Sequence, residues 1–271
     1  MTNRDPVPCA DSRKWFTHFS LRSMTALHVS RNEALQLTEK ERATITKSIQ
    51  QFQLGEGSKG QRLLERGQKY GRAANDSLFA GALEMFIKEE QQHSRYLASF
   101  MESQSIPLVQ KHWVDTVFRK LRGLAGLELS LTVLVTAEII SVPYYRALRA
   151  ATASPILKLI CTRLLEDETN HLRFQASMLA RVGSKRPPAF QRALGELHRA
   201  FLSGTLLVVW VEHRPVFEAA GYGFLRFKKE ALSEFSSWNA LRNSLREQSP
   251  ARQKTGHEQM ITNSGRVESG T

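Results

Sequence analysis

Two pairs of glutamate and histidine interrupt the apolar stripes of predicted helices, and they limit the fold more than any other feature of the chain. Glu90 and His93 stand at positions of a stripe whose other members are apolar, and Glu168 and His171 do the same further along. A spacing of three residues puts both members of a pair on one face of a helix. The pattern therefore predicts helices that turn two carboxylates and two imidazoles into a core.

Single glutamates occupy the same kind of position in two other predicted helices, Glu56 in the first and Glu138 in the third. A buried carboxylate without a partner is costly, and a metal ion shared with other carboxylates removes that cost. Two helices with Glu-x-x-His and two with one Glu each have the ligand pattern of dinuclear iron or manganese sites in helix bundles. The predicted metal ligands are Glu56, Glu90, His93, Glu138, Glu168 and His171.

The alternative is that these six residues are surface or salt-bridged side chains that share core stripes by chance. This alternative applies most to Glu56, because Gly55, Gly57 and Gly60 around it are poor helix formers. The first helix is therefore expected to be distorted there, and a solvent-exposed Glu56 is the competing interpretation. An isolated Glu-x-x-His is common, and only the combination on four helices favours metal.

The periodicity predicts an all-α protein, since the long segments lack the short alternating runs of strands. Four main helices are expected, at about 37–71, 76–102, 124–152 and 154–181. A long crossover with a short helix at 116–121 joins the second to the third, in which Pro143 is expected to make a kink. Two C-terminal helices are expected at about 190–211 and 223–245. The predicted organisation is a flexible N-terminal segment 1–36, a four-helix bundle 37–182, C-terminal helices packed on the bundle 183–245, and a disordered tail 246–271.

Cysteine usage and hydropathy predict a chain without disulfides or membrane spans. Its two cysteines, Cys9 and Cys161, imply no disulfide framework. The longest apolar run, 129–142, contains Glu138 and is shorter than the roughly 20 residues that cross a bilayer. Because the first 24 residues do not resemble a signal peptide either, we expect a cytoplasmic protein with no transmembrane segment. The net charge of +12 is scattered along the chain, which favours a solvated basic surface over nucleic acid as a partner.

Three short sequence segments contain predicted ligands: Gln53-Leu54-Gly55-Glu56, Glu89-Glu90-Gln91-Gln92-His93 and Asp167-Glu168-Thr169-Asn170-His171. With them the chain resembles the ferritin-like di-iron carboxylate proteins over about residues 45–181, in particular a bacterial branch of ferritin-like domain proteins. The resemblance implies a ferritin-like four-helix bundle with two iron ions, or manganese in one or both positions. It also implies two terminal carboxylates, two bridging carboxylates and one histidine for each ion: Glu56 and Glu138, Glu90 and Glu168, and His93 and His171.

The same resemblance implies acceptors for the outer ring hydrogens of the two histidines. Asp167 is expected to orient His93, and Glu89 is expected to orient His171. An ordinary salt bridge on the helix surface is the alternative for Glu89. His213, at the end of an apolar helix, is expected to be a structural histidine.

Within that group the residues favour the oxidation of an organic molecule by elimination. Peroxidases of similar fold are expected to carry a carboxylate where this chain has Ser141. Radical-generating subunits are expected to carry a tyrosine where it has Leu97, and arylamine oxygenases a histidine where it has Leu164. The helices after residue 183 would complicate a storage shell. We therefore expect an oxygen-activating di-iron oxidase or oxygenase that uses dioxygen, an organic substrate and a separate electron donor, with a homodimer as one expected assembly. The alternatives are a ferroxidase or a peroxide- and iron-stress-protective protein, and an RNA-modifying protein that binds nucleic acid.

Overall fold

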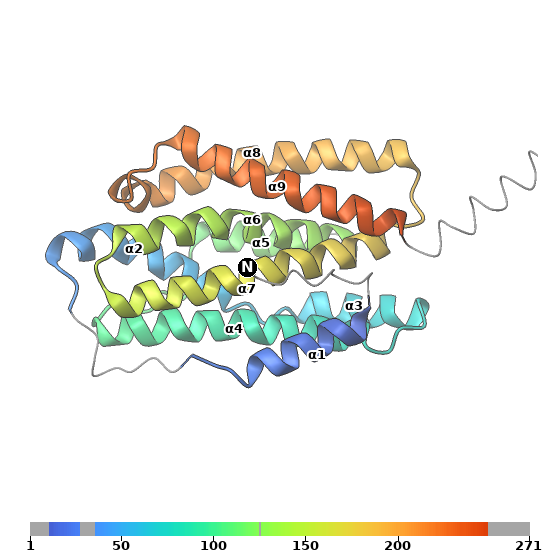
Figure 1. The fold of residues 1–271 in the computed structure, drawn as a ribbon, viewed down its shortest axis with the longest axis horizontal. Coiled ribbons are helices and arrows are strands. Elements are labelled where there is room, and N and C mark those ends of the chain that lie inside the picture. Colours follow the sequence, from blue (N-terminus) through green and yellow to red (C-terminus); the bar gives the residue numbers. More distant parts are fainter. Residues whose placement is uncertain (1–10, 28–35, 125, 249–271) are drawn as a thin grey trace, which may run out of the picture.

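The computed structural model describes residues 11–27, 36–124 and 126–248, and all regular structure in these ranges is helical (Figure 1). The prediction of an all-α protein is therefore confirmed for the described residues. The helices are α1 (Ser12–Ser23), α2 (Glu39–Glu56), α3 (Gln61–Ala73), α4 (Phe79–Ser103), α5 (Trp113–Leu124), α6 (Leu127–Ala151), α7 (Pro155–Val182), α8 (Pro188–Ala219) and α9 (Phe224–Glu247). The predicted tail lies outside the described residues from 249 onward, and its first two residues belong to α9.

Local sequence accounts for several helix ends. Thr38 begins α2 with a capping box, in which Thr38 and Glu41 each accept a hydrogen bond from the other's backbone. Ser154 caps α7, and Pro155 takes the first helical position, where its missing N–H has no partner to lose. Pro143 lies inside α6 without ending it. The predicted second, third and fourth helices thus correspond to α4, α6 and α7.

The prediction of one continuous helix over 37–71 is wrong, because α2 ends at Glu56 and α3 begins at Gln61. Gly60 between them has a φ of +59°, in the left-handed region that favours glycine. A Cβ on Gly60 would lie only 2.5 Å from Ile87 Cδ1 of α4. The chain therefore leaves the helical path and passes close to α4 before it becomes helical again.

The prediction of a flexible segment over 1–36 is wrong for residues 12–23, which form α1. Trp15 and Phe19 are buried there, and the ring of Phe19 packs edge-on against Phe174 with centroids 5.1 Å apart. Burial of these two rings against α4 and α7 stabilises a helix too short to persist alone. The rest of that prediction falls largely outside the described residues.

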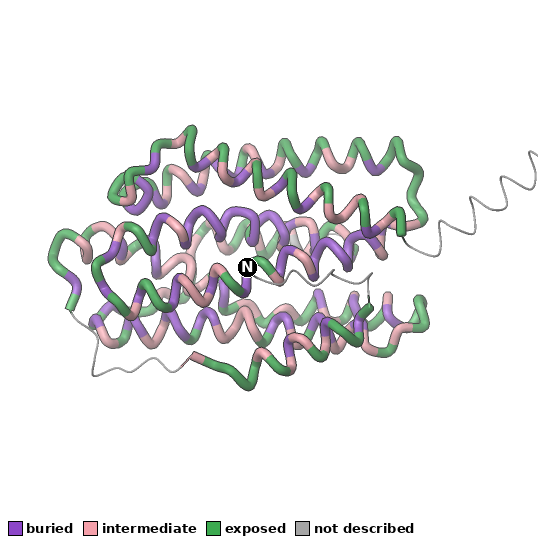
Figure 2. Tube along the Cα trace, viewed as in Figure 1, coloured by how far each residue is buried: buried purple, intermediate pink, exposed green. Residues whose placement is uncertain are grey.

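The helices form three layers that are visible from the side (Figure 1). α1, α3 and α4 form one edge, α2, α5, α6 and α7 lie in the middle, and α8 and α9 form the opposite edge. α6 packs most extensively against α7, α8 packs on α6 and α2, and α9 packs on α7 and α6. The middle layer is the most deeply buried, α6 in particular (Figure 2).

Two helices, α6 and α8, have the length and hydropathy that a membrane span would need. Within the most apolar window of α6, 72% is buried inside the fold, which agrees with the core helix predicted around 129–142. The corresponding value for α8 is only 28%. Length and composition are weak evidence for a span, and burial by other helices accounts for α6 but leaves the outer face of α8 uncovered.

Candidate metal centre

Four helices bring the six predicted ligands together where α4 faces α2, α6 and α7 of the middle layer. α2 contributes one glutamate, α4 a glutamate and a histidine, α6 one glutamate, and α7 a glutamate and a histidine. Their nitrogen and oxygen atoms form three overlapping groups, and within each group these atoms lie no more than 4.8 Å apart. The three groups are Glu90, His93 and His171; Glu56, His93 and Glu168; and Glu138, Glu168 and His171.

His171 belongs to two of these groups. Its Nδ1 is 2.9 Å from Glu90 Oε1, 3.5 Å from Glu168 Oε2 and 3.7 Å from Glu138 Oε2. Glu90 Oε1 is also 3.7 Å from His93 Nδ1. One carboxylate on α4 therefore faces both imidazoles, which is the position that a bridging ligand would need.

The atoms that face inward lack hydrogen-bond partners among the described residues. They are both carboxylate oxygens of Glu168, Oε1 of Glu90, and Nδ1 of His93 and of His171. Although Glu90 Oε1 and His171 Nδ1 are close, they are not aligned as a hydrogen bond. Buried polar atoms without partners are destabilising, and several of them around one point can all be satisfied by a cation. The donor set therefore fits a metal centre.

The opposite ring nitrogen of each histidine does have a partner. His93 Nε2 lies 3.2 Å from Asp167 Oδ2, and His171 Nε2 lies 2.9 Å from Glu89 Oε2. These are the two contacts expected from the sequence, and the surface salt bridge considered for Glu89 is not what the structure has. A carboxylate accepts, so Nε2 carries a hydrogen in each pair, and the neutral form of each ring directs the lone pair of Nδ1 into the cluster.

Asp167 is fixed by two cations of its own. Arg22 Nε donates to Asp167 Oδ1 at 2.6 Å, and Arg163 Nε donates to Asp167 Oδ2 at 2.9 Å. Burial opposes ionisation of Asp167, but His93 and Arg22 outweigh it and hold the pKa of this carboxyl well below its usual range. Arg22 belongs to α1, which was not predicted from the sequence, so α1 holds Asp167 in place from outside the cluster.

Glu56 and Glu138 are also oriented by side chains that the sequence reasoning missed. The hydroxyl of Tyr145 donates to Glu56 Oε1, and Gln175 Nε2 donates to Glu138 Oε1 at 2.8 Å. Glu56 is only 8% exposed, so the alternative of a solvent-exposed Glu56 is wrong. Gln175 follows His171 by one helical turn, and that spacing on a buried face was the signal that could have identified it.

The four innermost groups have strongly perturbed acidities. Burial raises the pKa of Glu90 and of Glu168, and the negative charge of Glu138 raises both further. Burial acts on Glu138 in the same sense, but protonated Glu168 and His171 outweigh it and lower the pKa of Glu138 to about 2. The pKa of His171 is well above its ordinary value despite burial, because Glu90 and the other carboxylates attract its proton. Without a cation the cluster shares a few protons, which a bound metal would displace.

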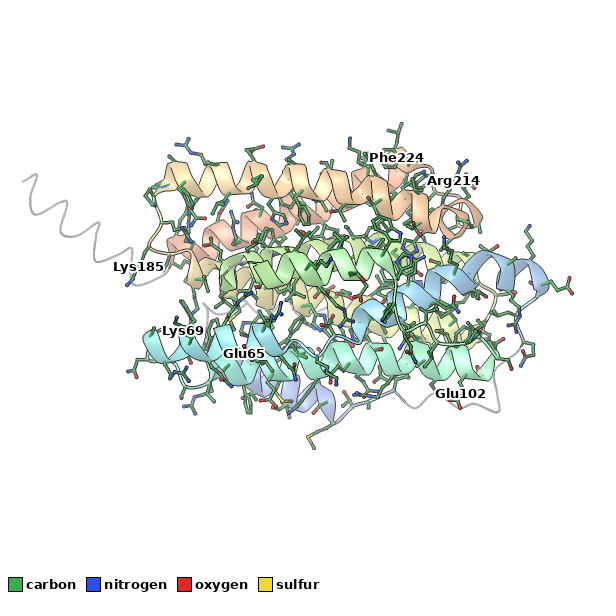
Figure 3. All side chains as sticks on the ribbon, turned by 180° about the vertical axis from the view of Figure 1, so that it is seen from behind. Glu65, Lys69, Glu102, Lys185, Arg214 and Phe224 are labelled. Atoms are coloured by element: carbon green, nitrogen blue, oxygen red, sulfur yellow. The ribbon has the colours of Figure 1, made fainter. Side chains whose placement is uncertain are left out.

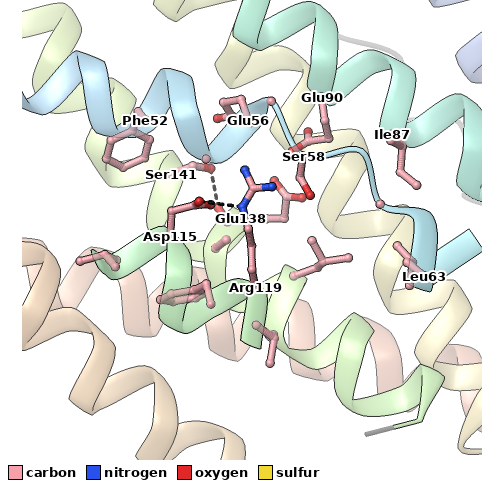
Figure 4. A pocket seen from close by; sticks show the side chains of 18 of the residues that line it. Phe52, Glu56, Ser58, Leu63, Ile87, Glu90, Asp115, Arg119, Glu138 and Ser141 are labelled. Atoms are coloured by element: carbon pink, nitrogen blue, oxygen red, sulfur yellow. Dashed lines mark hydrogen bonds and ion pairs between the residues drawn. The ribbon is translucent and has the colours of Figure 1, made fainter. Parts of the chain in front are cut away.

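A cavity of about 530 Å³ opens beside the cluster, where α2 gives way to α3 (Figure 4). Glu56, Glu90 and Glu138 line one part of it, and Arg119 points into it from α5 while it pairs with Asp115 at 2.6 Å. Much of the remaining wall is apolar and includes Phe52, Leu63, Phe86, Ile87, Val133 and Ile140. The cavity can therefore hold an organic molecule within reach of three of the six predicted ligands.

His213 lines the far part of this cavity and is a buried, hydrogen-bonded residue. Its Nδ1 is 2.8 Å from Ser48 Oγ, which in turn is 2.9 Å from the hydroxyl of Tyr144. Burial lowers the pKa of His213 to about 3, so the ring is neutral at physiological pH. The structural role predicted for this residue agrees with these contacts.

No family model, curated protein or solved structure matches the chain. The class of the protein therefore follows from its own geometry. It is an all-helical protein with a buried cluster of glutamate and histidine side chains that can hold metal ions.

Proposed function

We propose that this chain is a ferritin-like di-iron protein in which dioxygen oxidises an organic molecule bound in the adjoining cavity. The observation that carries the proposal is the set of buried inward atoms without hydrogen-bond partners among the described residues. Carboxylate oxygens and imidazole nitrogens suit iron or manganese. The ferritin-like assignment is supported by the order of the groups along the chain, which is Glu on α2, Glu-x-x-His on α4, Glu on α6 and Glu-x-x-His on α7.

The proposed ligands divide into two bridging carboxylates and two terminal pairs. They are Glu90 and Glu168 as bridges, Glu56 with His93, and Glu138 with His171. Two ferrous ions held by these residues would supply the electrons needed to reduce dioxygen, and a separate electron donor would have to restore them. Manganese in one or both positions is the alternative composition.

The chain's own residues hold the ligands in place before any ion binds. Asp167 and Glu89 fix the tautomer and the orientation of the two imidazoles through Nε2. Tyr145 and Gln175 each occupy one oxygen of a terminal carboxylate and leave the other free to turn inward. Asp167, Tyr145 and Gln175 are buried, so competition by water for these contacts is low. Little reorganisation is therefore needed on binding, which favours affinity.

The cavity supports an organic substrate over iron as the only substrate. Its volume of about 530 Å³ lies in the range of about 300–1,000 Å³ common for small-molecule sites. A protein that only oxidises or stores iron needs no apolar chamber next to its metal ligands. The largely apolar wall favours a substrate that is mostly hydrocarbon.

Nothing in the described surface favours the nucleic-acid alternative. Lys69 and Lys185 point outward near one end of the molecule, from different helical layers, and Arg214 points outward near the other end (Figure 3). Several other cations are already paired, such as Arg146 with Glu234 at 2.9 Å. A phosphate backbone is bound by cations gathered on one face, so the positive net charge alone does not support that function.

The first test is metal content per chain after anaerobic loading with ferrous iron. Wild-type protein is compared with the double variant Glu90→Ala, Glu168→Ala, which lacks both proposed bridges. The matched control is Glu84→Ala, Glu166→Ala, which removes two exposed glutamates from the same two helices. We expect about two irons in wild type and control and a joint loss in the bridge variant.

A wild-type protein that binds no iron or manganese would refute the metal centre. If the centre forms, oxygen uptake separates the two enzymatic functions. Sustained, multi-turnover oxidation of ferrous iron without any organic compound would identify a ferroxidase. Uptake that requires both a reductant and an apolar organic compound supports the proposed oxidase or oxygenase.

A further inference from the structure

The outer face of α8 carries an exposed apolar stripe. The inner face packs on α6 and α9 through buried residues such as Leu202 and Val209. α8 lies at the edge of the molecule, and its outward turns are exposed (Figure 2). This α8 stripe consists of Ala193, Leu197, Ala200, Gly204, Leu207 and Val211, all exposed. Its three large members, Leu197, Leu207 and Val211, are 66%, 55% and 72% exposed.

The spacing of the α8 stripe is that of a helix which contacts another helix along its length. Successive members are separated by four, three, four, three and four residues, so they stay on one line for about 27 Å. The middle of the stripe is small, with Ala200 and Gly204, and no atom lies within 4 Å of the place where a Cβ on Gly204 would stand. Small residues there let a second backbone approach closely. No described helix of this chain covers the stripe.

The stripe has the same spacing when it is followed in either direction, so it can pair with a copy of itself. Suppose that a second α8 runs antiparallel to the first, with the two-fold axis passing between the two stripes at the level of Leu202. Each large residue then meets an apolar partner, and the two small residues meet at the axis. The opposed pairs are Leu197 with Leu207, Ala200 with Gly204, and Ala193 with Val211. A heptad-like seam in which the two alternating positions face each other is the pattern of an antiparallel helix pair.

The ends of α8 are complementary in the same arrangement. Exposed Arg214, which pairs with Glu218 in its own chain at 2.7 Å, comes opposite exposed Phe190, whose ring already has Arg186 on one face. Glu218 comes opposite Lys185 and Arg186, the latter paired with Glu128 at 2.6 Å, so charges of opposite sign face each other there. Antiparallel helices also align their dipoles favourably. Charge and shape therefore favour the same orientation.

We propose that the chain forms a homodimer through antiparallel packing of the α8 stripe against the stripe of a second copy. The inference is independent of the metal centre, because the stripe faces away from it. A lipid surface is the competing occupant of an exposed apolar helix. It would favour a broad face of bulky side chains, whereas half of the α8 stripe is alanine or glycine, and exposed Glu196 and Arg199 lie on its borders.

The test uses the full chain and sedimentation equilibrium. Wild type is expected to be a dimer. Leu197→Lys and Leu207→Glu, each alone, are expected to weaken dimerisation by at least about a hundredfold, because each buries two unpaired charges per dimer. When the two variants are mixed, Lys and Glu come opposite each other once per dimer and the wild-type leucine pair is kept at the other position. The mixture is therefore expected to form heterodimers at concentrations where each variant alone is monomeric.

The matched control is Leu159→Glu, which places the same charge on an exposed leucine of α7 outside the stripe and should leave the dimer intact. Circular dichroism of every variant shows whether it is folded. A monomeric wild type, a dimer that survives both single substitutions, or a mixture that stays monomeric would overturn the proposal. Binding of a monomeric wild type to phosphatidylglycerol vesicles that is lost in Leu197→Lys would assign the stripe to a lipid surface instead.

Discussion

Replacement of Glu168 by glutamine is expected to stabilise the metal-free protein and to remove the stabilisation expected from the proposed iron. Glu168 is completely buried, and neither of its carboxylate oxygens has a hydrogen-bond partner among the described residues. Burial raises its pKa, and the charge of Glu138 raises it further. A neutral amide of the same shape is better tolerated at this position than a carboxylate as long as no cation is present.

The two effects are large enough to reverse the order of stability. Glu168 must either hold a proton that the unfolded chain would release or carry an uncompensated charge, and removing such a buried carboxyl group is worth roughly 1–4 kcal/mol. Each kcal/mol raises Tm by about 2–4 °C in a chain of this size. Iron at a hundred times its Kd adds about 2.7 kcal/mol to a protein that binds it only when folded. The variant lacks a bridging ligand and gains little of that. We therefore expect the variant to have the higher Tm with a chelator present and wild type to have the higher Tm with iron.

The advantage of the metal-free variant should increase with pH. The folded-state pKa of Glu168 is raised above its ordinary value of 4.5, so the unfolded chain loses this proton first. The group therefore contributes stability below pH 4.5 that is lost as the pH rises through the raised pKa. Glutamine has no such proton, and the difference between the two proteins should be smallest near pH 4.5 and grow above it.

Scanning calorimetry with a chelator and with anaerobic ferrous iron, at several pH values, measures all three effects. Glu166→Gln is the matched control, since Glu166 is exposed two residues earlier on the same helix, and its effect should stay within about 0.5 kcal/mol. A metal-free Glu168→Gln protein that melts below wild type would refute the reasoning about the buried charge. An unchanged shift with iron would refute the role of Glu168 as a ligand.

Three further changes test the surroundings of the cluster. Asp167→Asn should weaken iron binding by about 10–100-fold in a titration, because the imidazole loses its charged acceptor, and unchanged affinity would leave Asp167 a purely structural role. Gly60→Ala should lower the free energy of unfolding in urea by about 1–3 kcal/mol through its positive φ and Ile87, whereas Gly55→Ala, inside α2 and in open space, should not destabilise. Because burial lowers the pKa of His213 to about 3, this group should contribute stability that is complete above pH 6.5 and lost toward pH 3. His213→Gln should flatten that dependence in urea midpoints, and an unchanged slope would contradict it.

The long helices and the inward positions of the six proposed ligands could be predicted because their signals are local. In α4 and α7 the apolar stripe and the three-residue spacing are contained within about seven turns of one helix, and Ser154 and Pro155 also mark the start of α7. Asp167 and Glu89 could be predicted only through the resemblance, since no local rule identifies the acceptor of a histidine on another helix. The tertiary structure then brings Asp167 to His93 and Glu89 to His171.

The features that were missed depend on contacts between distant segments. Trp15 and Phe19 are too few to give α1 a clear periodic stripe, and their burial becomes evident only when α4 and α7 are in place. Arg22 has no sequence neighbour that marks it as a partner of Asp167, 145 positions away. Tyr145 fitted the apolar stripe of its helix, and nothing local indicated that its hydroxyl reaches a carboxylate on α2.

The break between α2 and α3 connects the least predictable part of the backbone with the chemistry proposed for the cluster. A continuous helix would bury Glu56 but would also fill the space beside it with a further helical turn. Instead, Gly57 ends α2 directly after Glu56, and the left-handed Gly60 carries the chain against α4 before α3 begins. Ser58 and both of these glycines line the cavity that reaches Glu56, Glu90 and Glu138. The glycines that disfavour helix after Glu56 therefore also create the cavity in which we propose that a substrate binds. If that proposal holds, filling the cavity should affect substrate oxidation more than metal binding.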